Sequence, residues 1–381
     1  MSIAVVPAEI KGHRYLELDS LRGIGASIVV FGHFAGLWSS SAWYSAVNSS
    51  PLRALFAAHE AVVLFFVLSG FVLSIPLSGE RPPSYRVFLL RRFCRIYLPF
   101  AAAILSAAVC SFFLYSTVPT GNPWIDRTWS IRPTFSLLLG HLLTTTQSEA
   151  QLNTAIWTLI VEIRVSLIFP ILFWLTRRLH PALSLGVLAA LSAGLPFVRH
   201  GNYFEGEVIN PAYVAMFVGG ILLWLHLPWV SRSLHSIGAM RRGVFLLISF
   251  LTLEGPHAIN AWFGDGLPQS ILNLEEFIMG VGGVGLLASA IHIRSFTRFL
   301  HHPVLVRLGA LSYSTYLMHP TVLFVLIRLY YGKCPFYYIT PLYLAGVYIV
   351  SELFHKFADQ PSIMLGRRVG RKGKRPSEAL A

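Results

Sequence analysis

The chain has 381 residues, of which 55% are hydrophobic and 12% are charged, and its formal net charge is +13 at pH 7. The charged fraction is about half that of an ordinary soluble domain, which excludes a soluble globular protein. The lysines and arginines lie between apolar stretches rather than on one polar module, which argues against a nucleic-acid partner. Cys94, Cys110 and Cys334 are far apart and predict neither a disulfide framework nor a metal site.

Apolar stretches long enough to cross the hydrocarbon core of a bilayer recur along the chain. We therefore predict an all-α polytopic transmembrane helical bundle of about ten spans, with nine or eleven as alternatives. A further apolar segment at 134–143 is too short to span and is interpreted as an interfacial or re-entrant piece. The expected spans are 21–38, 57–77, 97–117, 156–176, 182–198, 209–227, 243–262, 271–292, 309–331 and 336–357.

The basic residues predict the orientation. With an even number of spans, most of the 30 lysines and arginines fall on the side that carries both termini, and positive charge concentrates in cytoplasmic loops. We expect residues 1–14 to form a cytoplasmic tail, 15–365 the membrane domain and 366–381 a basic cytoplasmic tail. The first apolar stretch follows about twenty mixed residues and contains a histidine, so we interpret it as a retained span rather than a signal peptide.

Two ionisable side chains, Arg22 and His33, lie in the first expected span, where such groups are costly and therefore candidates for function. Their spacing of eleven residues places them on one helix face with a rise of about 16 Å between them. If Arg22 lies at the cytoplasmic interface, His33 is near the bilayer midplane, and its helix face must border a protein cavity. Asp19 precedes Arg22 by the spacing of an ion pair within a helix.

The chemistry of this pair suits catalysis. An imidazole takes a proton from a hydroxyl near neutral pH, and a guanidinium forms paired contacts with phosphate or carboxylate. The alternative is structural: His33 hydrogen-bonds to a neighbouring helix, and Arg22 anchors the cytoplasmic end of the span.

An arginine and a histidine separated by ten residues on the first span are the hallmark of the acyltransferase-3 family, which this sequence resembles. These integral-membrane enzymes include O-antigen, exopolysaccharide and nodulation-factor acetylases. The resemblance covers about residues 15–365, and the sequence departs from it at Ile163, where many relatives have an acidic residue, and at Asp359, which replaces a glutamate. The further similar stretches are FFVLSGF (Phe65–Phe71), RRFCRIYLP (Arg91–Pro99), WTLIVEIRVSLIFP (Trp157–Pro170), LGALSYSTYLMHP (Leu308–Pro320) and FADQP (Phe357–Pro361).

The resemblance implies transfer of an acyl group, usually acetyl, from acyl-CoA to a hydroxyl of a glycan or lipid-linked saccharide at a bacterial inner (plasma) membrane, without a metal. His33 would then activate the hydroxyl or handle the acyl group, and Arg22 would hold the donor or orient the active face. Arg91, Arg92 and Arg95 would meet the CoA phosphates at the cytoplasmic mouth, with plain cytoplasmic anchoring as the alternative. A homo-oligomer is left open.

Glu162 is the carboxylate inside the fourth expected span. In the first interpretation, Glu162 is the acid/base partner of His33 or orients its imidazole. In the alternative, it forms an ion pair with Arg164 or with a residue of another helix.

Other polar and small residues within the expected spans have structural alternatives. Tyr313, Tyr316 and His319 are candidates to line the acceptor side, although His319 precedes a proline and could mark a kink. Ser69, with Gly70 beside it, is a supporting residue of the site or a point of close helix contact, the interpretation that we favour. The GVGGVG sequence at 280–285 matches a dinucleotide motif, but it lies in an apolar helix without a preceding strand and predicts helix packing.

A polytopic transporter of a small or saccharide-like solute is the alternative function, because intramembrane Arg, Glu and His in Gly- and Pro-interrupted helices also suit a transport path. The two halves of the sequence show no matching pair of interrupted segments, which favours the enzyme. A third alternative keeps the fold without catalysis, as a binding module.

Overall fold

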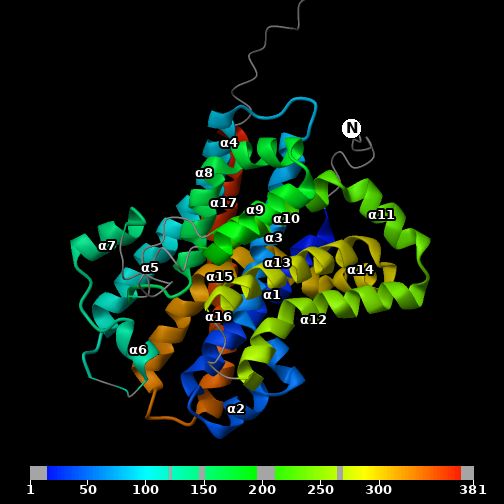
Figure 1. The fold of residues 1–381 in the computed structure, drawn as a ribbon. Helices are drawn as coiled ribbons and strands as arrows, with labels where there is room; N and C mark the ends of the chain where they lie inside the picture. The colour runs from blue at the N-terminus through cyan, green and yellow to red at the C-terminus, as the bar shows by residue number, and fades with distance from the viewer. Residues whose placement is uncertain are drawn as a thin grey trace, which may run out of the picture. The chain divides into compact units, whose positions relative to one another are not determined.

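The computed structural model describes residues 15–118, 120, 122–145, 151–194, 211–263 and 269–369. These residues are largely helical and include no strand (Figure 1), which confirms the all-α class. The chain folds as two compact units, each described separately below. Unit 1 comprises Met1–Pro82 and Ile168–Ser312, and unit 2 comprises Pro83–Leu167 and Tyr313–Ala381. The expected tail at 1–14 and positions 370–381 of the C-terminal tail lie outside the described residues.

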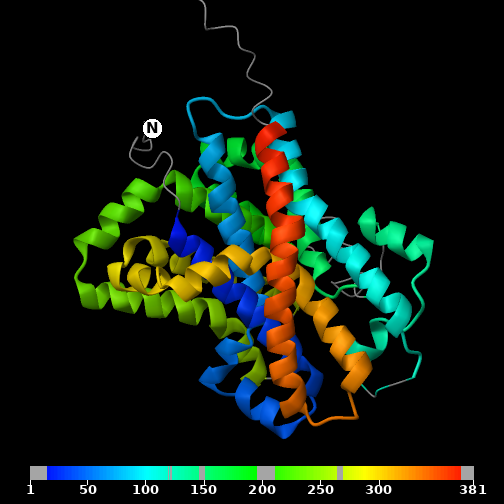
Figure 2. The ribbon, with the colours of Figure 1, turned by 180° about the vertical axis from the view of Figure 1, so that it is seen from behind.

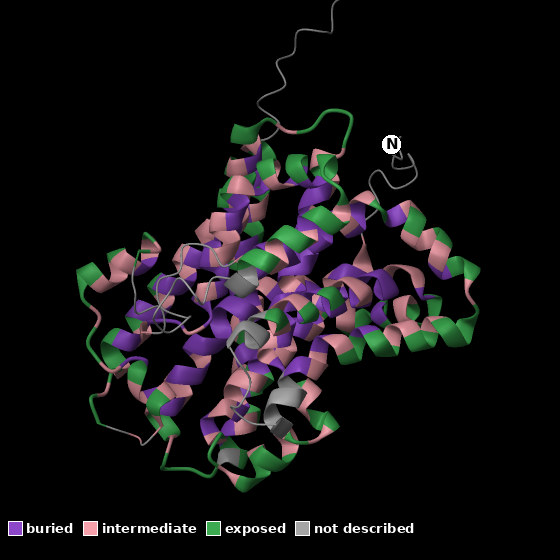
Figure 3. Ribbon diagram, in the orientation of Figure 1, coloured by how far each residue is buried: buried purple, intermediate pink, exposed green. Residues whose placement is uncertain are grey.

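Unit 1 is a bundle around α3 and α10, whose residues are mostly buried (Figure 3). It also contains the end of α8 (Ile156–Arg178) and the beginning of α15 (Pro303–Tyr330). Its other elements are α1 (Leu16–Ala35), η2 (Gly36–Trp38), α2 (Ala42–Asn48), η3 (Pro51–Leu55), α3 (Ala58–Leu77), α9 (Pro181–Gly194), α10 (Pro211–Leu225), α11 (Leu227–Ser236), α12 (Ala239–Phe263), α13 (Gln269–His292) and α14 (Arg294–Leu300).

Glycines allow the helices of unit 1 to approach closely. A Cβ atom on Gly70 would overlap the backbone of Phe217, so α3 and α10 touch through their backbones there. The Phe66 and Phe217 rings stack beside this point at 5.4 Å. A Cβ atom on Gly282 would likewise overlap the backbone of Leu253, where α13 packs on α12. The packing interpretation of Gly70 and of the GVGGVG sequence is therefore confirmed.

Unit 2 contains two π-helical turns, η4 and η7, a rare geometry that is frequent at functional sites. Figure 2 shows α16, η7 and α17 following one another as one long helical path. The expected interfacial segment forms the short α7. Besides the first part of α8 and the rest of α15, the elements of unit 2 are α4 (Tyr85–Arg92), η4 (Phe93–Tyr97), α5 (Leu98–Leu114), α6 (Pro123–Arg127), α7 (Phe135–Leu142), α16 (Phe336–Phe354), η7 (His355–Asp359) and α17 (Gln360–Val369).

Several helices are suited to cross a membrane, which agrees with an integral membrane protein. Helices α10 and α11 are long and apolar enough to cross a membrane only if they are taken together as one span, and the chain bends by 72° between them. The expected span 182–198 is described only as far as Gly194. The number of spans and the orientation therefore stay predictions. Within the described residues, six helical segments are each long and apolar enough to cross a membrane: Leu16–Trp38, Ala58–Leu77, Tyr85–Leu114, Ile156–Arg178, Leu274–His292 and Pro303–Tyr330.

Candidate functional site

Helix α1 carries Arg22 near its beginning and His33 in its last turn. The Nη1 atom of Arg22 lies 3.5 Å from Oδ1 of Asp19, the partner expected from the spacing of the two residues. Both side chains are partly exposed, so the pair leaves Arg22 accessible to a ligand. The two candidate residues thus lie about 16 Å apart along one helix.

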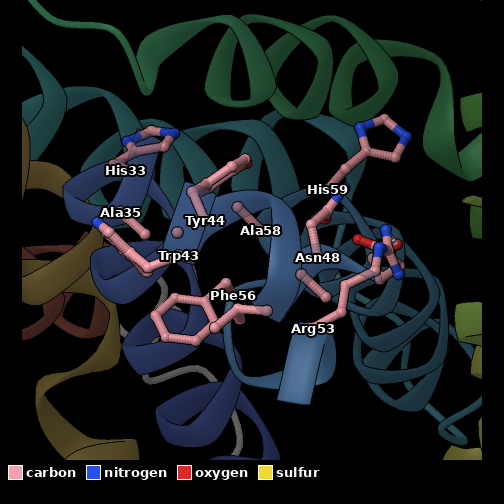
Figure 4. Close-up of a pocket in the computed structure, with 13 residues that line it drawn as sticks. His33, Ala35, Trp43, Tyr44, Asn48, Arg53, Phe56, Ala58 and His59 are labelled. Atoms are coloured by element: carbon pink, nitrogen blue, oxygen red, sulfur yellow. Dashed lines mark hydrogen bonds and ion pairs between the residues drawn. The ribbon is translucent and has the colours of Figure 1, made fainter. Parts of the chain in front are cut away.

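His33 lines a cavity of about 220 Å³ in unit 1 (Figure 4). The last turn of α1, helix α2, the segment with η3 and the first turn of α3 form its wall. Its lining includes the aromatic rings of Trp43 and Tyr44 and the amide of Asn48. The imidazole therefore borders a protein cavity, as the cost of a polar group at membrane depth predicts.

The local sequence explains how this wall forms. Gly32 has no side chain, and a Cβ atom there would lie 2.7 Å from the carbonyl oxygen of Phe56. The segment before α3 can therefore pack against α1 directly beside His33. Ser41 begins α2 as its N-cap: its Oγ accepts from the backbone N–H of Tyr44 at 3.4 Å and donates to the carbonyl of Trp38 at 2.5 Å.

A second histidine, His59, lines the same cavity from the first turn of α3 (Figure 4). Its Nε2 atom lies 2.6 Å from Oε1 of Glu276 on α13. A carboxylate at this distance fixes the orientation of an imidazole and stabilises its charged form. The cavity therefore brings together His33 and a histidine–carboxylate pair that the sequence analysis did not single out.

Arg53 and Glu60 form an ion pair in the cavity wall. The Nη1 atom of Arg53 also lies 3.0 Å from Oε2 of Glu254 on α12. One guanidinium thus joins two carboxylates, which ties η3, α3 and α12 together at the cavity wall. The signal for this cluster was present in the sequence, because charged residues within or at the ends of apolar stretches are costly and seldom incidental.

In unit 2, the candidate carboxylate Glu162 is paired with Arg92: Oε1 lies 2.6 Å from Nη2 of the arginine. The Nε atom of Arg92 donates to Oγ of Ser166 at 3.2 Å, and this hydroxyl donates to the carbonyl of Glu162 at 2.7 Å. Arg164, the other expected partner of Glu162, donates to the carbonyl of Thr144 at 3.3 Å. Glu162 therefore joins its helix to α4, as the reading of an ion pair with another helix predicts.

Arg95 and Asp359 connect the two π-helical turns of unit 2. Nη1 of Arg95 lies 2.7 Å from Oδ1 of Asp359, and Nδ1 of His355 lies 2.8 Å from Oδ2 of the same carboxylate. The Asp359 side chain is 1% exposed. The guanidinium also lies 5.4 Å from the ring centre of Tyr313, whose hydroxyl donates to the carbonyl of Ile96 at 2.7 Å. Asp359 thus organises this end of unit 2, although it replaces the usual glutamate.

The remaining candidates have varied surroundings. Ser69 lies on α3 next to Gly70, and Arg91 is exposed on α4. The Tyr316 hydroxyl is 2.7 Å from that of Thr158, and Nδ1 of His319 lies 3.1 Å from the carbonyl oxygen of Thr315. His319 is fully buried, and α15 continues through the following proline. Among the described residues, no group of three or more His, Cys, Asp or Glu side chains is placed to hold a metal ion.

The chain matches the family model described as an acyltransferase domain over residues 15–354. It is 26% identical to acyltransferase MdmB of Streptomyces mycarofaciens over 327 residues, which cover 81% of this chain and 82% of that protein. It is 24% identical to nodulation protein 10 of Rhizobium leguminosarum bv. viciae over 376 residues, covering 93% of this chain and 94% of the relative.

A third relative is longer than the chain. The O-acetyltransferase OatA of Staphylococcus aureus is 24% identical over 383 residues, which cover 91% of this chain and 57% of that protein. No solved structure matches the chain. Two of these three relatives are named as acyltransferases, which favours the enzyme over a transporter. Because the family model covers nearly the whole membrane domain, the chain belongs to the acyltransferase-3 family of integral-membrane acyltransferases.

Proposed function

We propose that the protein is an O-acyltransferase that moves an acetyl group from acetyl-CoA to a hydroxyl of a glycan or lipid-linked saccharide at a bacterial inner membrane. The observation that carries this proposal is the position of His33, which lines a cavity within a membrane acyltransferase. The name of one relative, O-acetyltransferase, supports acetyl as the group and oxygen as the acceptor atom.

The transfer requires one proton acceptor and one proton donor. The hydroxyl oxygen attacks the carbonyl carbon of the thioester, so that a C–O bond forms and the C–S bond breaks. His33 accepts the proton of the hydroxyl, and the same proton then passes to the sulfur of the departing CoA. A neutral imidazole suits both steps, because its unprotonated nitrogen accepts a proton and then returns it.

The other residues of the His33 cavity have supporting roles in this proposal. The pair of His59 and Glu276 orients the acceptor or assists the movement of the proton. The rings of Trp43 and Tyr44 offer the apolar faces on which a sugar ring can lie, and Asn48 offers an amide for its hydroxyl groups.

Arg22 would meet the donor at the other end of α1, where Asp19 orients it. Of the three arginines of the RRFCRIYLP motif, Arg91 is exposed and available to an anionic donor. Arg92 and Arg95 already bind carboxylates, so their proposed role is to position this segment.

The acceptor can be identified by mass spectrometry. Cells that express the protein would be grown with isotope-labelled acetate, and their surface glycans and lipid-linked saccharides would be compared with those of cells that lack it. The proposal predicts a labelled ester on one glycan class, removed by mild alkali and absent with His33→Ala. Identical acylation with and without the protein would contradict it.

A further inference from the structure

Basic side chains in unit 1 surround two adjoining cavities that the site described above does not use. One cavity is about 320 Å³ and the other about 420 Å³, and both are lined by His235, His292 and Arg294. None of the described residues that line them is acidic. We call the two together the basic cavity; its remaining charged or titratable residues are Arg242 in the first part, and Arg298 and His301 in the second.

Among the described residues, the arginines of the basic cavity have no carboxylate partner. Within the described part of the chain, Arg242, Arg294 and Arg298 form no ion pair. Arg92 and Arg95 of unit 2, in contrast, each bind a carboxylate within 2.7 Å. The positive charges of the arginines that line the cavity repel one another, and an anion bound between them reduces this repulsion.

His292 supplies a second, independent indication. Its Nε2 atom is buried and has no hydrogen-bond partner among the described residues. The ring meets that of His235 edge-on, with 5.9 Å between their centres. A buried polar atom without a partner costs about 1–3 kcal/mol, so an acceptor oxygen of a ligand at this position would be favourable.

The basic cavity lies beside the end of α1 that carries Arg22. The Ser20 hydroxyl donates to the carbonyl of Leu300 at 2.6 Å, and Nε2 of His301 lies 3.0 Å from Oε2 of Glu17. These contacts hold α14 against the first turns of α1, at the opposite end of the helix from His33. The distribution of positive charge predicts that this end faces the cytoplasm, where a CoA thioester would arrive.

We propose that the basic cavity binds the phosphate groups of the acyl-CoA donor; this rests on the proposed function and names the donor site for it. Guanidinium groups form paired, charge-assisted hydrogen bonds with phosphate oxygens. CoA carries a diphosphate and a separate 3′-phosphate, and the two parts of the cavity would receive these two groups. An anionic lipid headgroup shares the phosphate chemistry, so the test must separate the two sources.

The affinity for CoA would be measured by calorimetry with the full-length protein in nanodiscs of zwitterionic lipid. Arg294→Ala and Arg298→Ala should each weaken CoA binding about 10- to 100-fold, the loss expected for a hydrogen bond to a charged group. Arg241→Ala is the matched control, because Arg241 is exposed on α12 next to Arg242 but lines neither cavity. It should leave the affinity unchanged.

A comparison of CoA with 3′-dephospho-CoA tests the basic cavity without changing the protein. The unaltered protein should bind 3′-dephospho-CoA more weakly than CoA, and this difference should shrink in the variant whose arginine contacts the 3′-phosphate. CoA affinity that is unchanged in both Arg294→Ala and Arg298→Ala would overturn the proposal. An equal loss in Arg241→Ala would do the same, since it would show a general effect of positive charge.

Two further measurements distinguish CoA binding in the basic cavity from the acyl-transfer reaction and from the binding of an anionic lipid. His33→Ala should bind CoA with unchanged affinity while losing transfer, so CoA binding and the proposed reaction can fail independently. Nanodiscs that contain phosphatidylglycerol would be compared with the zwitterionic ones. If the arginine variants lose retention of this lipid and keep their affinity for CoA, the cavity belongs to the membrane lipid and the donor proposal is wrong.

Discussion

Arg92 and Glu162 join two of the sequence motifs through an ion pair with 2.6 Å between Nη2 and Oε1. Arg92 belongs to the RRFCRIYLP stretch and Glu162 to WTLIVEIRVSLIFP. Ser166 completes the contact, because its hydroxyl accepts from Arg92 and donates to the backbone carbonyl of Glu162. The contact gives both motif residues a structural role within unit 2, whatever further role the chemistry assigns them.

Breaking the pair of Arg92 and Glu162 should destabilise the protein. The two side chains are 16% and 20% exposed, so we expect Glu162→Gln to cost about 1–3 kcal/mol, below the range for a fully buried pair. Thermal unfolding in detergent measures the loss. Arg91→Ala, on the same helix but exposed, should leave the transition unchanged. A Glu162→Gln variant as stable as the unaltered protein would contradict the structural role.

Removing Arg95 should destabilise the protein more than neutralising Asp359. Arg95→Ala leaves the buried Asp359 carboxylate with His355 as its remaining partner, so we expect a loss somewhat below the roughly 3–5 kcal/mol of an uncompensated buried charge. Asp359→Asn leaves an arginine that is 43% exposed, which water can solvate, so its cost should be smaller. Chemical unfolding of both variants gives the comparison, with exposed Arg86 changed to alanine as the control. The opposite order of stability would contradict this account.

The glycine contacts predict opposite effects of the same substitution at two positions. Gly70→Ala places a methyl group against the backbone of Phe217, and separating two packed helices should cost about 1–3 kcal/mol. Gly243→Ala, within α12, meets nothing within 4 Å and should be neutral or stabilise by up to about 1 kcal/mol. Thermal unfolding of the two variants measures both effects. Equal destabilisation would show that close helix contact is not the reason for Gly70.

The pair of His59 and Glu276 should matter for transfer more than for folding. Glu276→Gln keeps the shape of the side chain but removes the charge that orients His59, so we expect kcat to fall about 10-fold or more. The KM for acetyl-CoA should not change, because the donor is proposed to enter at the other end of α1. Steady-state kinetics at varied donor concentration separate the two constants. A raised donor KM with an unchanged kcat would contradict this role.

The fold class could be predicted from the sequence because a bilayer imposes a simple rule. Long apolar stretches form helices, and polar groups among them must face protein. The same rule places Arg22 and His33 on one helix and His33 at a cavity, as the structure has them. The bend between α10 and α11 was harder to predict, because a proline stands at the start of α11, whereas α15 continues through Pro320.

The partners of the charged residues could not be predicted from the sequence. Arg95 and Asp359 are separated by 264 positions, and His59 and Glu276 by 217. Spacing along one helix identifies neighbours such as Asp19 and Arg22, but it carries no information about contacts between helices. Family motifs drew attention to Arg95, whereas His59 and Glu276 lie outside the quoted motifs and become visible only through the cavity that His59 shares with His33.

His33 carries the acyl transfer in the proposed mechanism, and its most direct test is the rate of transfer by His33→Ala. Purified protein in liposomes would receive radiolabelled acetyl-CoA and the acceptor identified by mass spectrometry, with His180→Ala, an exposed histidine, as the control. We expect the rate to fall about 10²- to 10⁴-fold in His33→Ala, with an unchanged unfolding temperature and CoA affinity. A His33→Ala rate within a few-fold of that of the unaltered protein would contradict the account.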